Sequence, residues 1–365
     1  MVSQERRLNW QTKGSEDMKE KVLPFLQQEI DQNHIPGAVI SISYKNETVL
    51  QEAVGNRVVF PSKEPMELTT VFDLASLTKV VATLPSLLLL MEAGELHLDD
   101  TVGHFIPEFK KQGKAGITIK HLLTHSSGLP AHREYFKESL TTEQIMERIF
   151  EEGLIAPSGE KVIYSDLGFI TLYKVIEKIT SESFPEFVQR GLFEKLDMKE
   201  TMYLPSYERE RYAATEYSEL LKDYKHGIVH DDNTESMGGI SGHAGLFSTI
   251  ADLSNFASMI ENGGVFRGKK ILSEQTIQLT KQNFTPYSQE FRGLGWILKS
   301  PALSSCGDLF SKHSYGHTGF TGTSIWFDPE IQLHVILLTN RVHFGRKDPI
   351  IRLRPRLHNI IRAQF

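Results

Sequence analysis

The stretch FDLASLTKVV, residues 72–81, places Ser76 and Lys79 three positions apart among apolar residues. The segment that follows, VATLPSLLLLMEAG, predicts a helix. Residues at i and i+3 share a helix face, so the hydroxyl and the amine would be neighbours. Two interpretations are open: a nucleophile beside its base, or a helix-capping serine beside a surface lysine. Because S-x-x-K occurs by chance in many chains of this size, this stretch alone favours the second.

A second stretch, EKVIYSDLGFI, carries Tyr164 and Asp166 on a predicted turn before a helix. A serine hydroxyl is a weak nucleophile unless a neighbour takes its proton. A lysine does so only where burial or a nearby cation lowers its pKa, whereas a tyrosine phenol can both donate and accept a proton. The alternative is that Tyr164 is a half-buried aromatic. In the same alternative Asp166 caps the next helix, and such capping is compatible with a catalytic role.

A third stretch, SYGHTGFTGTSIWFDPE, places His317, Thr318 and Gly319 before a predicted strand. Glycine lets the backbone approach a ligand closely, and exposed N–H groups at a strand edge could stabilise an oxyanion. The alternative is a glycine-rich connector with a surface histidine.

Predicted strands lie towards both ends of the chain, with helices between them. We therefore predict an α+β fold in which N- and C-terminal strands share one antiparallel sheet. Residues 1–73 and 241–365 would form the sheet region, residues 74–240 would form a mainly helical insertion, and the site would lie in the cleft between them. The predicted hairpin spans 34–55, the late strands 293–298, 323–327 and 331–339, and the marked helices 16–33, 249–264 and 351–365.

Composition bounds the class of protein. The 365 residues carry a net charge of -6, from 40 basic and 46 acidic residues, which gives no reason to expect nucleic acid as a partner. The single cysteine, Cys306, excludes an internal disulfide framework. The longest apolar run, 80–91, is too short to span a bilayer. We expect a cytoplasmic chain, or an extracytoplasmic one if a leader precedes it, acting on a small-molecule or peptide-like substrate.

Several histidines could carry other chemistry. His226 and His230 lie four apart in HGIVHDDN, a spacing that could chelate a metal on a helix, with His243 as a third ligand. Because HExxH and a cysteine set are absent, we expect these residues to border the substrate cleft, with no metal and no cofactor. His125 lies beside two serines, but no G-x-S-x-G surrounds them, so we interpret it as a structural turn residue.

Taken in order, S-x-x-K, Y-x-[N/D] and [K/H]-T-G resemble the motifs of the serine β-lactamase and penicillin-binding protein superfamily. The tyrosine makes the chain similar to the branch of class C β-lactamases, DD-peptidases, D-aminopeptidases and related esterases. The resemblance extends over roughly residues 20 to 362. Its longer segments are HIPGAVISISYKNETVLQEAVGNR, FDLASLTKVVATLPSLLLLMEAGELHLDDTVGHFIPEF, ITIKHLLTHSSGLP and GGISGHAGLFSTIADLSNFASMIENGG.

The resemblance implies an acyl-enzyme mechanism. Ser76 would be the acylated nucleophile, Lys79 its partner and Tyr164 the proton relay, while the backbone N–H groups of Ser76 and Phe320 would form the oxyanion hole. Water would then hydrolyse the acyl-enzyme, and whether Lys79 or Tyr164 is the general base stays open. The implied function is a serine hydrolase acting on a cell-wall peptide-type amide or a small ester. The alternative is a penicillin-binding or acylated sensor module without efficient turnover.

Three substrate-side positions depart from the family pattern or vary within it. Asp166 stands where penicillin-recognising members carry asparagine; a carboxylate can only accept, and it should keep Lys79 protonated. We therefore expect poor β-lactamase activity and room for an amine-bearing substrate group. His317 replaces the usual lysine and would carry only part of a charge near neutral pH. Arg346 resembles the class C arginine near the substrate carboxylate, with a structural salt bridge as the alternative.

Overall fold

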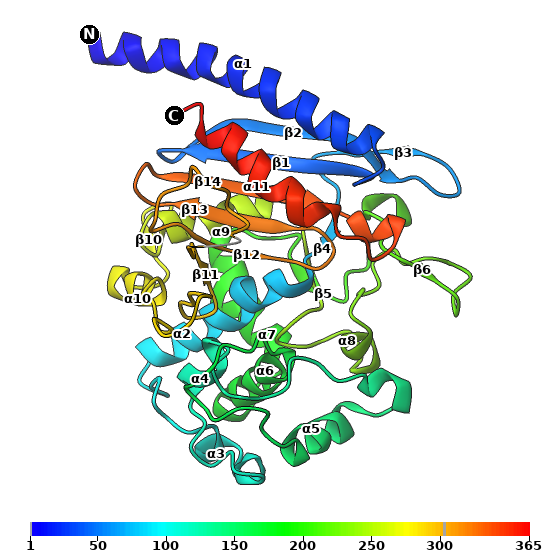
Figure 1. Ribbon diagram of the computed structural model, residues 1–365, viewed down its shortest axis with the longest axis vertical. Coiled ribbons are helices and arrows are strands. Elements are labelled where there is room, and N and C mark those ends of the chain that lie inside the picture. The colour runs from blue at the N-terminus through cyan, green and yellow to red at the C-terminus, as the bar shows by residue number, and fades with distance from the viewer. Residues whose placement is uncertain (1, 302–303) are drawn as a thin grey trace.

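The computed structural model describes residues 2–301 and 304–365 and contains one large antiparallel sheet. Its strand order is β11-β12-β13-β14-β1-β2-β3, so strands from both ends of the chain lie side by side, as predicted (Figure 1). The α+β prediction is confirmed. The strands are β1 (Gly37–Tyr44), β2 (Glu47–Val58), β3 (Glu64–Pro65), β11 (Ile297–Leu298), β12 (Tyr315–Thr318), β13 (Ser324–Asp328) and β14 (Leu333–Thr339).

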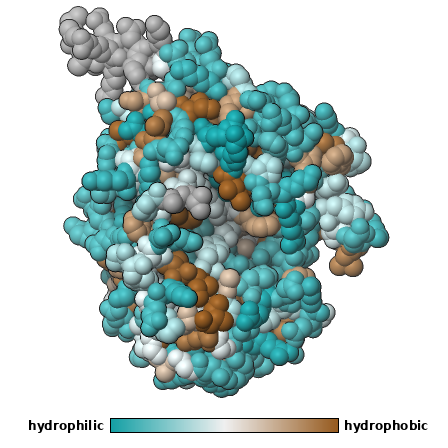
Figure 2. Space-filling view, in the orientation of Figure 1, coloured by the Kyte–Doolittle hydropathy of each residue, from teal (hydrophilic) through white to brown (hydrophobic). Residues whose placement is uncertain are grey.

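The centre of this sheet is buried on both faces. In the β1–β14 pair, Ile40 lies opposite Leu337, and both pack in the core under the terminal helices α1 (Val2–Asp31) and α11 (Pro349–Arg362). Val39, one residue earlier, belongs to the other core, where α9 (Ile250–Glu261) contacts β1 and β14. Burial on both sides explains why β14 is mostly apolar, with five aliphatic residues among seven buried positions. The face seen in Figure 2 is mostly hydrophilic, with hydrophobic side chains in a few patches.

Helices fill the other half of the molecule (Figure 1). The segment Ala75–Glu92, which ends in α2 (Leu84–Glu92), is the one described stretch long and apolar enough to cross a membrane, and most of it is buried in the core. The strand that immediately precedes this segment in the chain, β4, belongs to a small sheet of order β4-β8-β5. The remaining elements of this half include α3 (Val102–Phe105), α4 (Ile119–Leu123), α5 (Thr142–Glu151), α6 (Asp166–Thr180), α7 (Phe184–Val188), α8 (Asp232–Ser236), β4 (Phe72–Asp73), β5 (Met202–Tyr203) and β8 (Leu246–Ser248).

Several element boundaries differ from the sequence prediction. Helix α1 begins at Val2 rather than at residue 16. Strand β11 keeps only two of the six predicted residues. The N–H of Gly293 donates to Trp296 O in a local turn, and Gly295 adopts a φ of +71°, so residues 293–296 do not belong to the strand. Thr249 caps α9 through the N–H of Asp252, as predicted. The division of the chain at residues 73/74 and 240/241 stays a prediction.

Candidate active site

Ser76 lies in a single 3-10 turn, η1 (Ala75–Leu77), directly after β4. Ala75 adopts a φ of +46°, which a side-chain-bearing residue keeps only where its surroundings hold it. The buried Asp73 carboxylate accepts the N–H of Ala75 at 2.8 Å and that of His230 at 2.6 Å. The serine is therefore presented by a strained turn that a buried carboxylate fixes, and not by a regular helix start.

Lys79 is fully buried, which rules out the surface-lysine interpretation. Its Nζ donates to Ser76 Oγ at 3.0 Å and to Asp166 Oδ1 at 2.7 Å, and it lies 3.4 Å from the carbonyl oxygen of His243. The lysine opens a π-helical turn, η2 (Lys79–Thr83), a geometry frequent at functional sites. One ammonium thus connects the serine, a carboxylate and the backbone of a distant loop.

Asp166 does not cap helix α6 as predicted. The N-cap position is Ser165, and Asp166 is the first helical residue, whose carboxylate faces Lys79 instead. Burial opposes the charge on Lys79, but the Asp166 carboxylate outweighs it, so the pKa of Lys79 is raised. Burial would likewise raise the pKa of Asp166, yet Lys79 and His132 hold it far below its usual range. The pair is therefore a buried ion pair at neutral pH.

Tyr164 lies against the same ammonium, with its ring centroid 4.7 Å from Lys79 Nζ. His125 stacks on this ring at a centroid distance of 4.4 Å. It also holds both neighbours of the tyrosine, since its carbonyl accepts Ile163 N–H at 2.8 Å and its Nδ1 accepts Ser165 N–H at 3.0 Å. His125 has the structural role predicted for it, and the structure adds that what it positions is Tyr164.

The loop after β12 packs directly on the serine turn. Thr321 Oγ1 donates to Asp73 O at 2.8 Å and Thr323 Oγ1 donates to Leu74 O at 3.1 Å. A Cβ on Gly319 would lie 2.5 Å from Leu74 O, so only glycine fits this approach. Phe320 follows, with its side chain 46% exposed. The glycine predicted to allow close approach does so against the protein's own backbone.

His317 is buried on β12 and is not a surface histidine. Its Nδ1 donates to Thr318 O at 2.9 Å. Burial, and then the nearby cations Lys79 and Arg292, lower its pKa well below the usual value. The expectation of a partial positive charge near neutral pH is therefore wrong. The ring also lies 6.1 Å from that of Tyr164, on which the Arg292 guanidinium lies at 5.6 Å.

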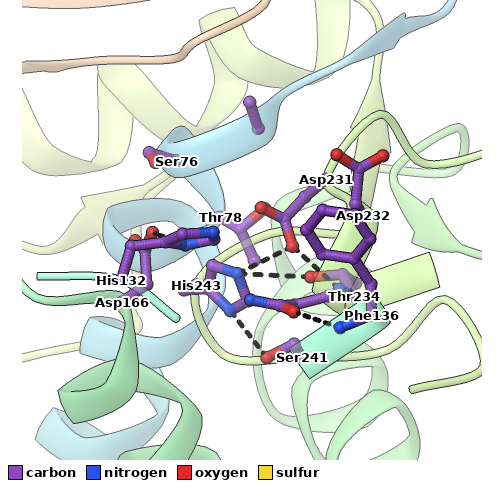
Figure 3. Close-up of polar contacts among 12 residues, drawn as sticks. Ser76, Thr78, His132, Phe136, Asp166, Asp231, Asp232, Thr234, Ser241 and His243 are labelled. Atoms are coloured by element: carbon purple, nitrogen blue, oxygen red, sulfur yellow. Dashed lines mark hydrogen bonds and ion pairs between the residues drawn. The ribbon is translucent and has the colours of Figure 1, made fainter. Parts of the chain in front are cut away.

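A cavity of about 400 Å³ opens onto Ser76. Figure 3 shows His132 and Asp166 on one side of it and Asp231, Asp232 and His243 on the other. Thr318 and Gly319 are not among its lining residues. The cavity is lined by Ala75, Ser76, His132, Glu134, Phe136, Tyr164, Asp166, His230, Asp231, Asp232, His243, Ala244, Phe320 and Arg346.

Arg346 forms the salt bridges that one of its two sequence interpretations expected, while its contact with a substrate carboxylate stays a prediction. It borders this cavity, and it also pairs with Glu216 at 2.9 Å and Asp232 at 3.1 Å. These two carboxylates raise its pKa although burial opposes them, so the cation is already neutralised before a ligand arrives.

The histidine cluster separates into different roles. His230 and His243 border the cavity, as predicted, whereas His226 is not among its lining residues and its ring donates to Tyr224 O. His243 Nε2 pairs with Asp231 at 3.0 Å and its Nδ1 lies 2.8 Å from Ser241 Oγ (Figure 3). Within residues 2–301 and 304–365 no group of three or more His, Cys, Asp or Glu side chains has a metal-binding arrangement.

Some residues of the site were not predicted from the sequence. His132 lies 3.7 Å from Asp166, and this carboxylate raises the pKa of the imidazole. Glu134 lines the cavity as well. The segment AHREY directly follows the ITIKHLLTHSSGLP segment, and that proximity was the available signal.

A serine, a buried lysine and a tyrosine gathered beside an antiparallel sheet define the class of penicillin-recognising serine enzymes and their hydrolytic relatives. The family model described as Beta-lactamase matches residues 23–358. The chain belongs to the beta-lactamase family, and its fold is the β-lactamase/transpeptidase-like fold.

Relatives and solved structures agree with this assignment. A protein of Escherichia coli (strain K12) named "Putative D-alanyl-D-alanine carboxypeptidase" is 30% identical over 89% of this chain and 82% of its own length. EstCE1, a hydrolase with promiscuous acyltransferase activity, has a TM-score of 0.77 at 21% identity, covering 95% of this chain and 99% of its own. The octameric penicillin-binding protein homologue from Pyrococcus abyssi has a TM-score of 0.72 at 24% identity, covering 90% and 74%.

Proposed function

We propose that this serine hydrolase forms an acyl-enzyme on Ser76 and hydrolyses a cell-wall peptide-type amide or a small ester. The observation that supports this most directly is the 3.0 Å contact between Nζ of the fully buried Lys79 and Oγ of Ser76. The names of a relative and of a similar solved structure, a putative carboxypeptidase and a hydrolase with promiscuous acyltransferase activity, are consistent with acyl transfer through Ser76.

In this mechanism Ser76 Oγ attacks the substrate carbonyl, whose oxygen would lie between the N–H groups of Ser76 and Phe320. Because Asp166 keeps Lys79 protonated, the lysine stabilises the negative charge that forms on Oγ. Tyr164 then relays the proton: its phenol oxygen accepts the serine proton as its own O–H proton passes to the leaving group. Water attacks the acyl-enzyme by the same route in reverse, and Ser76 is released.

The alternative, an acylated sensor, differs in turnover. We expect purified protein to release many equivalents of p-nitrophenol from p-nitrophenyl acetate, with a transient acetyl adduct on Ser76 detected by intact-protein mass spectrometry and peptide mapping. Release that stops near one equivalent with a stable adduct would support the sensor. A chelator added to the same assay should leave the rate unchanged, whereas loss of the rate on chelation would support a metal-dependent reaction.

Poor penicillin turnover should be traceable to Asp166. Its carboxylate cannot donate to the acylamino carbonyl of a penicillin, whereas an asparagine amide can. We expect Asp166→Asn to raise the rate of acylation by benzylpenicillin relative to p-nitrophenyl acetate by about 2- to 10-fold, the effect of one neutral hydrogen bond. The acetate ester lacks the acylamino group and serves as the internal control. An unchanged or reduced ratio would show that Asp166 does not determine this selectivity.

A further inference from the structure

Arg354, on helix α11, is a buried cation that faces backbone instead of a carboxylate. Its Nη2 donates to Gly319 O at 3.0 Å and to Thr323 O at 2.9 Å. Among the described residues it has no ion-pair partner, and its Nε has no hydrogen-bond acceptor. Burial, with the nearby Arg341, lowers its pKa to about 9, so the guanidinium remains charged at neutral pH.

The two carbonyl groups do not need this arginine to be satisfied. Gly319 O also accepts the N–H of Gly322 at 3.1 Å, and Thr323 O accepts the N–H of Gly319 at 2.7 Å. Burying a charge without a counter-ion is costly. A neutral side chain could fill this position at a lower cost in desolvation free energy if its only task were to pack against the loop. The presence of a cation therefore indicates a role for the charge itself.

The peptide unit that Arg354 contacts is the one that carries the proposed oxyanion donor. The carbonyl of Gly319 and the N–H of Phe320 belong to one planar trans unit and point in opposite directions. A guanidinium bonded to the oxygen fixes the direction of this N–H. It also polarises the amide, which strengthens the hydrogen bond that the N–H donates on the other side.

A second arginine holds the next peptide unit. Arg341 Nε donates to Phe320 O at 2.9 Å, and its guanidinium lies 4.7 Å from the centroid of the Phe320 ring. Both arginines approach the loop from the side of its carbonyl groups, while Thr321 and Thr323 bind it to the serine turn. The Phe320 N–H is thus held between two anchored peptide units.

We propose that Arg354 is a positioning residue for catalysis, which orients and polarises the Gly319–Phe320 peptide unit as an oxyanion donor. The inference rests on the proposed acyl-enzyme mechanism. It assigns a function in transition-state stabilisation to the C-terminal helix, whose buried apolar residues pack in the hydrophobic core.

The test compares Arg354→Met with Arg356→Met. Arg356 lies two residues further on the same helix and pairs with Glu29 at 2.7 Å, and it makes no contact with the oxyanion loop. The substrates are p-nitrophenyl acetate and its thiono analogue, in which sulfur replaces the carbonyl oxygen and accepts hydrogen bonds poorly. We expect Arg354→Met to lower kcat for the oxygen ester by about 10- to 100-fold with a nearly unchanged KM.

The preference for oxygen over sulfur separates positioning from simple loss of folded protein. Loss of active protein scales both rates equally, so a smaller oxygen-to-sulfur rate ratio in Arg354→Met supports the proposal. An unchanged ratio or an unchanged kcat overturns it. Arg354→Lys keeps a charge and one donor, so it should recover part of the ratio; if Arg354→Met does not fold, Arg354→Lys carries the test with a smaller decrease. Arg356→Met should match the wild type in kcat and ratio.

Failure of this inference is distinguishable from failure of the proposed function. If Ser76→Ala is inactive while Arg354→Met keeps both the wild-type kcat and the wild-type ratio, only the role of Arg354 is wrong. If Ser76→Ala hydrolyses the ester as fast as the wild type, the acyl-enzyme mechanism is wrong, and the role of Arg354 fails with it.

Discussion

Replacement of Ser76 with alanine is expected to lower the turnover of p-nitrophenyl acetate by roughly 10⁴-fold or more, the scale seen when a catalytic serine is removed. The variant keeps the Cβ, and the turn is held by backbone contacts of Ala75 and Leu74 that do not involve the hydroxyl. The melting temperature should therefore change little. The measurement is steady-state release of p-nitrophenol, with intact-protein mass spectrometry showing no acyl adduct.

Ser127→Ala is the matched control, because it removes the same hydroxyl from a buried serine that does not line the cavity beside Ser76. Its Oγ accepts the N–H of Leu129 at 3.3 Å, a local turn contact, so we expect nearly wild-type turnover. If both variants are as active as the wild type, the reacting group lies elsewhere and the cavity histidines His230 and His243 become the candidates. If Ser127→Ala is as impaired as Ser76→Ala, the loss reports general destabilisation.

The overall sheet could be predicted because its signal is local. Strand β1 alternates isoleucine with serine, β14 is a mostly apolar run, and helix α9 has a capping threonine and a glycine near its end, so each is visible within one window of sequence. The shortening of β11 was not predictable in the same way. It depends on Gly295 N–H bonding to Leu123 O, a contact between residues far apart in the chain.

The same distinction between sequence patterns and distant contacts applies to the residues of the active site. Ser76, Lys79 and Tyr164 could be proposed because their chemistry and order form a recognisable pattern, and the structure places Lys79 in contact with both of the others. The groups that hold them could not be predicted, since Asp73 acts through the backbone of His230 and Arg354 through the backbone of Gly319. Backbone acceptors and donors leave no residue-type signal, so a sequence pattern cannot indicate which side chain they bind.

The second large effect is expected at Lys79. Lys79→Met keeps the length and the apolar stem but removes the ammonium beside Ser76 Oγ, and we expect ester turnover to fall by roughly 10³-fold or more. It also leaves the Asp166 carboxylate in a buried site without its main partner. Breaking a buried ion pair from one side typically costs roughly 3–5 kcal/mol. The expected result is therefore a joint loss of activity and of thermal stability.

The pH dependence of that stability loss has a definite sign. The folded-state pKa of Asp166 lies far below its unfolded value of about 3.9. The contribution of Asp166 to the free energy of unfolding is therefore complete above the unfolded pKa, and it is lost as pH falls through the folded pKa. The folded-state pKa of Lys79 lies above its unfolded value of about 10.4. The contribution of Lys79 to the free energy of unfolding is therefore complete below the unfolded pKa, and it is lost as pH rises through the folded pKa. The gap in melting temperature between wild type and Lys79→Met should be widest between about pH 4 and 10 and shrink in stronger acid.

The double variant Lys79→Met/Asp166→Asn separates the two consequences. Removing the second charge relieves the unpaired carboxylate, so we expect most of the lost stability to return, while ester turnover stays as low as in Lys79→Met. Recovery of both would mean that the lysine acts only by neutralising Asp166, and that the serine is activated without it. If neither the stability nor the turnover returns, the loss of stability comes from the changed shape of the pocket and not from the unpaired carboxylate. Stability regained without activity is the outcome that assigns the ammonium to the chemistry on Ser76.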